Sequence, residues 1–557
     1  MLRQHSGCFV KVYIVTAVCF RCAFRAKMVS QFRRFHRDET GALIIFTLML
    51  FVLMLMMGGV AIDVMRYENI RTQLQNTLDR CTLMAAGLDQ SLDPQSVVED
   101  CVAKAGLTSS LDSVNVVQGF NSREVTTKGM SPTNPFFLHL IGIDRFDAKG
   151  IAGAMQRISN VELSLVLDVS GSMAGAKIAN LKSAASEFVD TVLQQDVEGR
   201  MSIALVPYNG QVNLGATLRA KYTTTDNPNV TDVNCIDLPA SVYNSTAMSR
   251  STAMPMTGYV DSYSTTWQNT GFVSTTDGWA VPHALNRWCP PSAANIVRPP
   301  SNNITRLQAN INGLSAIGAT SINAGLKWGL TLLDPGSRGM MSELISQGAV
   351  ASGFDGRPFD YTDPDALKII VLMTDGSHFK EERLNAGYRT GASVIYKSNG
   401  DGNYSIYHAG HSGSKYWVPH RSAWQTTPWN SGAGYTNQTW QQVWAAQRVS
   451  YVAWQMYARA LGADSNAMAT IYTQTMNMFR SQTEVPTMDA QLQQICSLAK
   501  AQNVIIYGIA FEAPAEGQAQ ISKCASSPSH YFNAQGLEIS TAFRAIANNI
   551  TQLKLTQ

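Results

Sequence analysis

The sequence contains an uncharged stretch that is long enough to cross a membrane. Residues 42–62 read ALIIFTLMLFVLMLMMGGVAI, 21 residues without a charged side chain. About 20 apolar residues are needed for a helix to cross the hydrocarbon core of a bilayer. A cleaved signal peptide is the alternative, but its apolar region usually has only about 7 to 15 residues, and no convincing A-x-A site follows here. We therefore predict a retained, single-pass transmembrane helix over residues 42–62.

The charges before this stretch predict its orientation. Three arginines stand against two acidic residues in the flank: Arg33, Arg34, Arg37, Asp38 and Glu39. Basic flanks stay in the cytoplasm, so residues 1–41 are expected to be a cytoplasmic leader and residues 63–557 to lie outside the cytoplasm. The compact basic start MVSQFRRFHRDETGALIIF also suggests that Met28 is the true initiator.

Cysteine usage agrees with export. The part predicted to lie outside carries six cysteines: Cys81, Cys101, Cys235, Cys289, Cys496 and Cys524. An even number suggests disulfides in an oxidising compartment, although sequence alone cannot choose among the possible connectivities. The simplest expectation joins nearest neighbours: Cys81 with Cys101, Cys235 with Cys289, and Cys496 with Cys524. No cysteine or histidine spacing indicates a zinc site.

The positive net charge belongs to the amino terminus. The chain holds 43 Lys+Arg and 40 Asp+Glu, a formal net charge of +3. Residues 1–62 contain eight basic and two acidic residues, so the remainder carries 35 basic and 38 acidic residues, a formal charge of −3. Nothing in this balance indicates a nucleic-acid-binding surface.

Strands and helices alternate in the carboxy-terminal part. Four short apolar runs rich in β-branched residues are typical of strands buried on both faces: VELSLVL (161–167), MSIALVPY (201–208), KIIVLMT (368–374) and NVIIYGIAF (503–511). Helical spacing separates them at residues 176–193 and 321–333. This order predicts an α/β fold with a doubly wound, mostly parallel sheet.

Oxygen-bearing side chains follow two of these strands. Asp168, Ser170 and Ser172 form D-x-S-x-S directly after the first strand, Asp375 ends the third, and Thr320 stands on a Gly-Ala loop before a helix. In doubly wound sheets, ligands bind outside the carboxyl ends of the strands. Mg²⁺ takes about six oxygen ligands at roughly 2.0–2.1 Å. These five residues are therefore candidate ligands of Mg²⁺, Mn²⁺ or Ca²⁺. The alternative is that the two aspartates only cap helices and accept loop amides.

The strand-Asp, loop-Thr, strand-Asp order resembles the metal-ion-dependent adhesion site of von Willebrand factor A domains. The resemblance covers residues 161–553 and implies that Asp168, Ser170 and Ser172 form the first ligand loop, Thr320 the second and Asp375 the third, some acting through water. It gives an A domain over residues 156–557, interrupted by insertions at about 209–303 and 376–486.

The amino-terminal region resembles Tad (tight adherence) pilus-assembly proteins. The match covers roughly residues 30–90, with RDETGAL before the span, and is echoed at residues 136–155. Residues 63–155 are expected to form a membrane-proximal helix and a small linker region. The chain as a whole resembles a TadG-like protein, which implies a bacterial inner membrane with the carboxy-terminal domain in the periplasm. Phe46 stands where prepilin-type members carry a Glu five residues after the cleavage-site Gly, so an assembly role is favoured over a pilus subunit.

The insertions leave from the edge of the sheet that carries the candidate ligands, so they are placed to wall or cover the site. The second insertion holds six tryptophans: Trp417, Trp424, Trp429, Trp440, Trp444 and Trp454. They form either a small local core or a binding platform for a partner or a glycan.

Three classes of function follow. The favoured one is a membrane-anchored assembly protein that uses a cation to grip a carboxylate on a pilus component or surface protein. A structural protein whose metal only rigidifies the fold is the second. An enzyme is disfavoured, because the chain lacks G-x-x-x-x-G-K-[ST], H-E-x-x-H and G-x-S-x-G; GHSGS at residues 410–414 misses the last motif by its final residue.

Overall fold

The computed structural model describes residues 41–87, 92–118, 122–157, 160–194, 196, 199–263 and 271–556. These residues fall into two compact units, and the boundary along the chain lies between Gln156 and Arg157. The leader up to residue 40, with the predicted start at Met28, lies outside the described residues.

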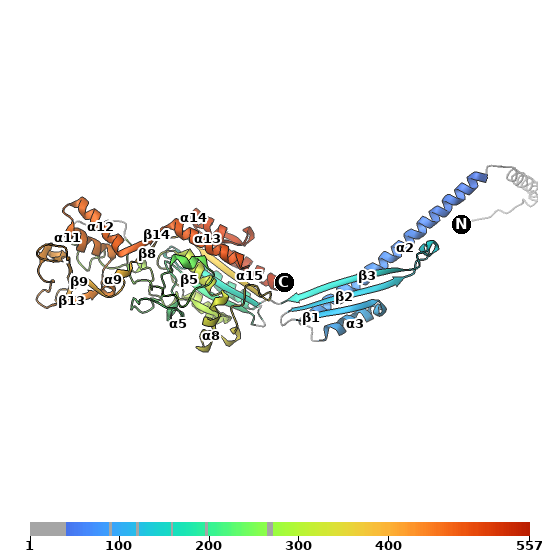
Figure 1. The fold of residues 1–557 in the computed structure, drawn as a ribbon, viewed down its shortest axis with the longest axis horizontal. Helices are drawn as coiled ribbons and strands as arrows, with labels where there is room; N and C mark the ends of the chain where they lie inside the picture. The colour runs from blue at the N-terminus through green and yellow to red at the C-terminus, as the bar shows by residue number, and fades with distance from the viewer. Residues whose placement is uncertain are drawn as a thin grey trace, which may run out of the picture. The chain divides into compact units, whose positions relative to one another are not determined.

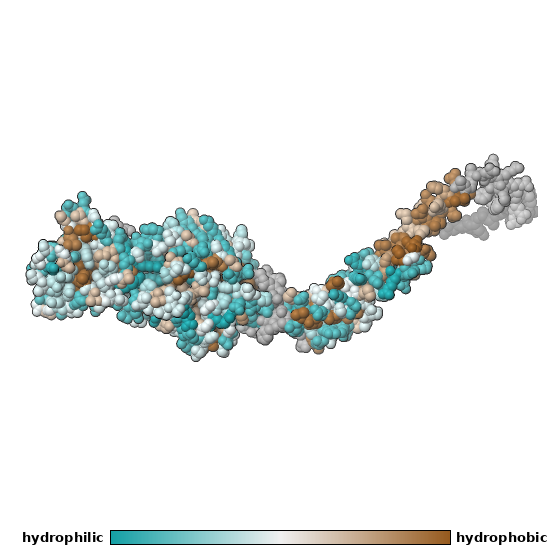
Figure 2. Space-filling view, viewed as in Figure 1, coloured by the Kyte–Doolittle hydropathy of each residue, from teal (hydrophilic) through white to brown (hydrophobic). Residues whose placement is uncertain are grey.

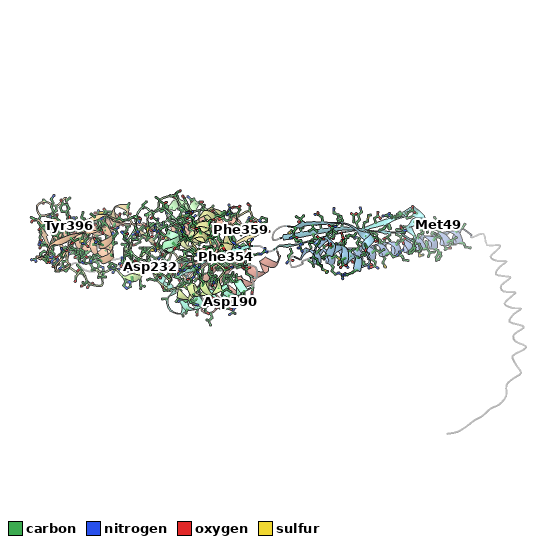
Figure 3. The ribbon with its side chains drawn as sticks, turned by 90° about the horizontal axis from the view of Figure 1, so that it is seen from below. Met49, Asp190, Asp232, Phe354, Phe359 and Tyr396 are labelled. Atoms are coloured by element: carbon green, nitrogen blue, oxygen red, sulfur yellow. A yellow bond between two sulfur atoms is a disulfide. The ribbon has the colours of Figure 1, made fainter. Side chains whose placement is uncertain are left out.

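The first unit consists of a long helix, a short helix and a three-stranded sheet (Figure 1). Its elements are α2 (Gly41–Ala86), α3 (Pro94–Lys104), β1 (Leu111–Gln118), β2 (Ser122–Thr133) and β3 (Phe146–Arg157), with sheet order β1-β2-β3. Helix α2 is one uninterrupted helix of 46 residues, so the predicted span continues into a helix beyond it. Among the described residues, α2 is the one helix long and apolar enough to cross a membrane. Its apolar half is exposed, as at Met49 (Figure 3).

The carboxy-terminal half of α2 packs on the small sheet through Leu74 and Leu78, both fully buried. Gly129 of β2 allows this approach, because a Cβ there would lie 2.7 Å from the carbonyl oxygen of Ser110 and 3.2 Å from Leu78. The disulfide Cys81–Cys101 joins α2 to α3.

The second unit is built on a six-stranded sheet. Its strands are β4 (Asn160–Asp168), β5 (Met201–Tyr208), β6 (Arg298–Ser301), β7 (Ala366–Thr374), β15 (Ile505–Phe511) and β16 (Tyr531–Ala534), in the order β16-β15-β7-β4-β5-β6. The β5–β6 pair is antiparallel, and the other pairs are parallel. The predicted doubly wound, mostly parallel sheet is therefore confirmed, as is each of the four predicted strands.

Helices cover both faces of this sheet. One core layer holds α4 (Ala176–Gln194), α6 (Ile304–Gly313) and α15 (Glu538–Thr556). The other holds α7 (Ile322–Thr331), α8 (Arg338–Ser346), α13 (Val485–Ala501) and α14 (Ala515–Cys524). Along β4, Leu163, Leu165 and Leu167 face the first layer and Val166 faces the second, which explains why apolar residues occur on both faces of the strand.

Two buried cations fasten the amino-terminal ends of the strands. Arg357 donates to the carbonyl oxygen of Arg200 at 2.7 Å and to Ser202 Oγ at 3.1 Å. Its guanidinium lies 5.0 Å and 5.3 Å from the ring centres of Phe354 and Phe359, both labelled in Figure 3.

The second cation is Lys368 of β7. It pairs with Glu162 of β4, and both side chains are at most 4% exposed. The candidate ligands follow the carboxyl ends of the same two strands, whereas this ion pair lies near their amino-terminal ends.

The insertions form their own structure. The first contains α5 (Gly215–Arg219) and the disulfide Cys235–Cys289. The second contains β8 (Glu381–Leu384), β9 (Ala392–Ser398), β10 (Tyr404–Tyr407), β11 (Tyr416–Val418), β12 (Ala423–Gln425), β13 (Tyr435–Thr439), α9 (Trp440–Ala446), α10 (Val449–Tyr451), the π-helix η10 (Val452–Ala458), α11 (Arg459–Leu461), α12 (Ser465–Phe479) and β14 (Arg480–Thr483). Five of its strands form a sheet in the order β12-β11-β10-β9-β13, with Tyr396 on β9 (Figure 3).

Four of the six tryptophans in this insertion are buried in one local core: Trp417, Trp440, Trp444 and Trp454. For these four, the local-core interpretation holds. The third disulfide, Cys496–Cys524, joins α13 to α14, so all three nearest-neighbour pairings are confirmed.

Short 3-10 helices complete the chain: η1 (Thr108–Ser110), η2 (Leu138–Ile141), η3 (Gly171–Met173), η4 (Ala240–Asn244), η5 (Ala284–Asn286), η6 (Pro335–Ser337), η7 (Ser352–Phe354), η8 (Ala386–Tyr388), η9 (Pro419–Arg421) and η11 (Pro528–His530).

Candidate metal centre

Three loops meet at the carboxyl ends of β4 and β7. The loop after β4 carries Asp168, Ser170 and Ser172, and Asp375 follows directly on β7. The third loop, which carries Thr320, is tied to the first by two backbone hydrogen bonds, from Gly171 to Gly318 (2.9 Å) and from Ile317 to Val169 (2.8 Å).

Asp168 is fully buried and has partners on both carboxylate oxygens. Its Oδ1 accepts the backbone N–H of Ser170 at 2.8 Å, and its Oδ2 accepts the hydroxyl of Thr374 at 2.7 Å. Taken alone, these contacts fit the alternative that Asp168 satisfies a loop amide. The other candidates add what that alternative does not explain.

The serine hydroxyls turn toward the second carboxylate. Ser172 donates to Asp375 Oδ1 at 2.7 Å, and the hydroxyls of Ser170 and Ser172 lie 3.0 Å apart. Ser170 Oγ lies 3.5 Å from the same Asp375 oxygen. Two strands that are distant in sequence thus bring two hydroxyls and a carboxylate to one point.

Thr320 is placed beside this group. Ser172, Thr320 and Asp375 line the same cleft, and a Cβ added at Gly376 would lie 3.7 Å from Thr320 Oγ1. The backbone of Thr320 is held by a hydrogen bond from Phe379 N–H to its carbonyl oxygen, at 2.9 Å. All five predicted residues therefore converge at one edge of the sheet.

A cation already contacts this group. The Lys177 ammonium donates to Asp375 Oδ2 at 2.9 Å and lies 3.8 Å from Glu512 Oε2. Our sequence reasoning missed Lys177, although it stands in the first turn of α4, five residues after Ser172. The second carboxylate oxygen of Asp375 thus already pairs with a positive charge.

The two carboxylates also influence each other. Burial, and then the nearby charge of Asp375, raise the pKa of Asp168 to about 6. A carboxyl group in this position binds a proton more readily than usual unless another positive charge compensates it.

These residues fit a hard divalent cation. Two carboxylates and three hydroxyls are the oxygen donors that Mg²⁺, Mn²⁺ and Ca²⁺ bind. Among the described residues, no group of three or more His, Cys, Asp or Glu side chains is placed to hold a metal ion; the candidate site offers two carboxylates and three hydroxyls instead.

The cleft above these residues has a volume of about 570 Å³. Its walls come from both insertions: Tyr263, Leu285 and Trp288 from the first, and His378 and Phe379 from the second. The rings of Tyr263 and Phe379 lie 5.6 Å apart, which joins the two walls. The expectation that the insertions wall the site is therefore confirmed, although the sequence did not indicate which residues would do so.

A family match supports the amino-terminal resemblance. Residues 41–88 match the family Tad, described as "Putative Flp pilus-assembly TadE/G-like". No curated protein sequence matches the chain.

Several solved structures are similar to the chain at low identity. The von Willebrand factor domain of the type V pili tip protein Mfa5 from Porphyromonas gingivalis is 13% identical, with 72% of this chain and 98% of that chain covered and a TM-score of 0.31. The adhesive tip pilin GBS104 from Group B Streptococcus agalactiae is 11% identical, with 71% of this chain and 99% of that chain covered and a TM-score of 0.28. The pilus adhesin SpaC from Lactobacillus rhamnosus GG is 11% identical, with 79% of this chain and 34% of that chain covered and a TM-score of 0.26.

At identities and TM-scores this low, the likeness says nothing of the ligand or partner of this chain. Its own sheet order and the D-x-S-x-S loop after β4 give the second unit a von Willebrand A-like architecture. The chain is thus similar to TadE/G-like pilus-assembly proteins over residues 41–88, and it carries a von Willebrand A-like domain from residue 157 onward.

Proposed function

We propose that this chain is a membrane-anchored, metal-dependent binding protein that acts in the assembly or adhesion of a Tad-type pilus. In this proposal α2 anchors the chain in a bacterial inner membrane, and the second unit lies in the periplasm. A divalent cation, Mg²⁺ or else Mn²⁺ or Ca²⁺, is held by Asp168, Ser170, Ser172, Thr320 and Asp375. The partner is a pilus-assembly or surface protein that offers a carboxylate.

The convergence of the five residues carries the proposal. They come from three loops, and they meet beneath an open cleft instead of in a closed interior. A bound cation would supply an electrophilic centre that accepts one external carboxylate, a charge-assisted contact of the kind that can dominate an interface.

Lys177 fits the same role. Its ammonium pairs with Asp375, and Glu512, 35% exposed, is a second carboxylate within its reach. We therefore expect Lys177 to turn toward Glu512 when a cation binds Asp375.

The aromatic walls favour a particular kind of carboxylate. Phe379 and Tyr263 are 40% and 37% exposed beside the candidate ligands. Aromatic surface of this kind contributes large contact area at low entropic cost. An acidic side chain next to an apolar residue, on a protein segment, matches both features.

Binding is favoured over catalysis by the state of His378, the imidazole nearest the candidate ligands in sequence. Its Nδ1 lies 2.6 Å from Asp489 Oδ1, and its Nε2 accepts the backbone N–H of Asn323 at 3.1 Å. With both ring nitrogens occupied, this imidazole is not available as a general base.

A pull-down from cells tests the proposal. Thr320→Ala removes one candidate ligand without removing a charge, so we expect a folded, membrane-inserted protein that no longer recovers its partners. The wild type should recover them with Mg²⁺ and lose them with a chelator. Thr305→Ala, an exposed threonine on α6 of the same unit, serves as the matched control and should behave as the wild type.

The outcomes separate the alternatives. If all variants recover the same partners with and without chelator, the metal grip is wrong. If chelator lowers the melting temperature but not partner recovery, the cation only rigidifies the fold.

A further inference from the structure

The turn between β2 and β3 exposes an unusual run of apolar side chains. Residues 134–143, here called the β2–β3 tip, read NPFFLHLIGI. Five of them are substantially exposed: Phe136 (65%), Phe137 (39%), Leu140 (67%), Ile141 (54%) and Ile143 (37%). Contiguous exposed apolar surface marks an interaction site more often than scattered single residues do.

The β2–β3 tip is fixed to α2 by one carboxylate. Asp63, 2% exposed, accepts the backbone N–H groups of Phe136 (2.9 Å), Phe137 (2.7 Å) and Leu138 (2.9 Å). The Arg66 guanidinium lies 4.0 Å from the centre of the Phe136 ring. The tip is therefore a built feature that is seated on the helix and not a free loop.

Its position along α2 sets its level relative to the membrane. The ring of Phe137 packs on Gly59, where a Cβ would lie 2.4 Å from the ring. Gly59 belongs to the uncharged span 42–62, and a helix rises about 1.5 Å per residue. Phe137 therefore contacts α2 about 6 Å before Asp63 along the helix axis. This contact lies within the segment that is proposed to cross the bilayer.

The apolar surface of the tip continues onto the helix. Residues of α2 at this level line an apolar hollow: Met56, Met57, Val60, Ala61, Val64 and Met65. Figure 2 shows hydrophobic residues along the exposed half of α2 and again at the β2–β3 turn beside it. Charged residues return directly after the tip, where Arg145 pairs with Asp147 at 2.7 Å.

We propose that the β2–β3 tip enters the outer face of the membrane beside α2, with Phe136, Leu140 and Ile141 among the lipid chains. This inference rests on the proposed anchoring of α2. The lipid is the occupant because the tip is continuous with the span and is seated within it. Two attachments, the helix and the tip, then hold the first unit against the bilayer and limit its rotation.

Spin-label accessibility in phospholipid vesicles tests the proposal on the full chain. A nitroxide is attached to Leu140→Cys, in a background where the leader cysteines Cys8, Cys19 and Cys22 are changed to Ser. Collisions are measured with oxygen, which concentrates in lipid, and with a water-soluble nickel complex. We expect frequent oxygen collisions and rare nickel collisions at Leu140, with Ile141→Cys as a second position should the first variant fold poorly.

Two further labels control the experiment. Val117→Cys, 57% exposed on β1 and paired with Glu124 at the other end of β2, should collide severalfold more often with nickel. Val52→Cys, 47% exposed within the span, should resemble Leu140.

Each other result overturns the tip insertion. Frequent nickel collisions at Leu140 with a lipid-like Val52 would leave the anchor standing and place the tip in water. Protection of Leu140 from both reagents would mean that a protein, or a second copy of this chain, covers it. A water-exposed Val52 would show that the proposed anchor itself is wrong.

Discussion

Millimolar Mg²⁺ should raise the melting temperature of the purified protein by several degrees, and Asp168→Ala should abolish that rise. A ligand that binds only the folded state stabilises it by about 2.7 kcal/mol when its concentration is a hundredfold above its dissociation constant. Asp168 is fully buried where three loops meet, so its replacement by Ala removes one of the two candidate carboxylate ligands. Thermal unfolding with and without Mg²⁺ measures the effect.

The informative quantity is the increment caused by the metal, because Asp168→Ala also changes the stability of the metal-free protein. Asp190→Ala is the matched control: Asp190 lies near the far end of α4 (Figure 3) and bonds Gln194. It should keep the full increment. An equal increment in Asp168→Ala would place the cation elsewhere.

The rise in melting temperature caused by Mg²⁺ should also depend on pH. Since the pKa of Asp168 is raised from 3.8 to about 6, the folded protein without metal holds, between these two pH values, a proton that the unfolded chain has released. This group therefore stabilises the metal-free fold at low pH, and that contribution is lost as the pH rises through about 6. A cation competes with that proton, so the increment should shrink below pH 6 and be full above pH 7.

Glu162→Ala should destabilise the second unit by about 3–5 kcal/mol, because it leaves the buried Lys368 ammonium without its charged partner. Both side chains are at most 4% exposed, and Glu162 also accepts the backbone N–H of Phe359 at 3.0 Å. Burial lowers the pKa of Lys368, so the unpaired lysine should release its proton more readily. Denaturant unfolding monitored by fluorescence measures the loss.

The double variant Glu162→Leu with Lys368→Met provides the control. Replacing both members of a buried ion pair by apolar residues is often neutral or stabilising, so most of the lost stability should return. If the single and double variants are equally unstable, the cost comes from packing and not from the unpaired charge. Neither variant should change the rise in melting temperature caused by Mg²⁺, because the ion pair lies at the amino-terminal ends of the strands and the candidate ligands lie at the carboxyl ends.

The sheet could be predicted from sequence because its strands leave a local signature. Strand β4 carries apolar residues toward both helix layers, and Asp168 and Asp375 stand at the carboxyl ends of β4 and β7. Thr320 could be placed by the Gly-Ala loop before α7. The disulfide partners could be named because each pair is close in sequence.

The remaining features depend on contacts between distant residues. The bond between Lys177 and Asp375 joins positions 198 residues apart. The cleft wall forms because the Trp288 indole N–H donates a hydrogen bond to the Ser262 hydroxyl and because the Tyr263 ring packs against Phe379 of the other insertion. The β2–β3 tip is seated on Asp63, more than 70 residues earlier. Local patterns carry no information about such pairings.

Anomalous scattering from crystals of the second unit grown with Mn²⁺ tests the proposed metal site itself. We predict one strong peak at the floor of the cleft, within coordination distance of oxygens from Ser172 and Asp375, with the Lys177 ammonium moved from Asp375 toward Glu512. A cleft without a peak at saturating Mn²⁺, with Lys177 still bonded to Asp375, would contradict it.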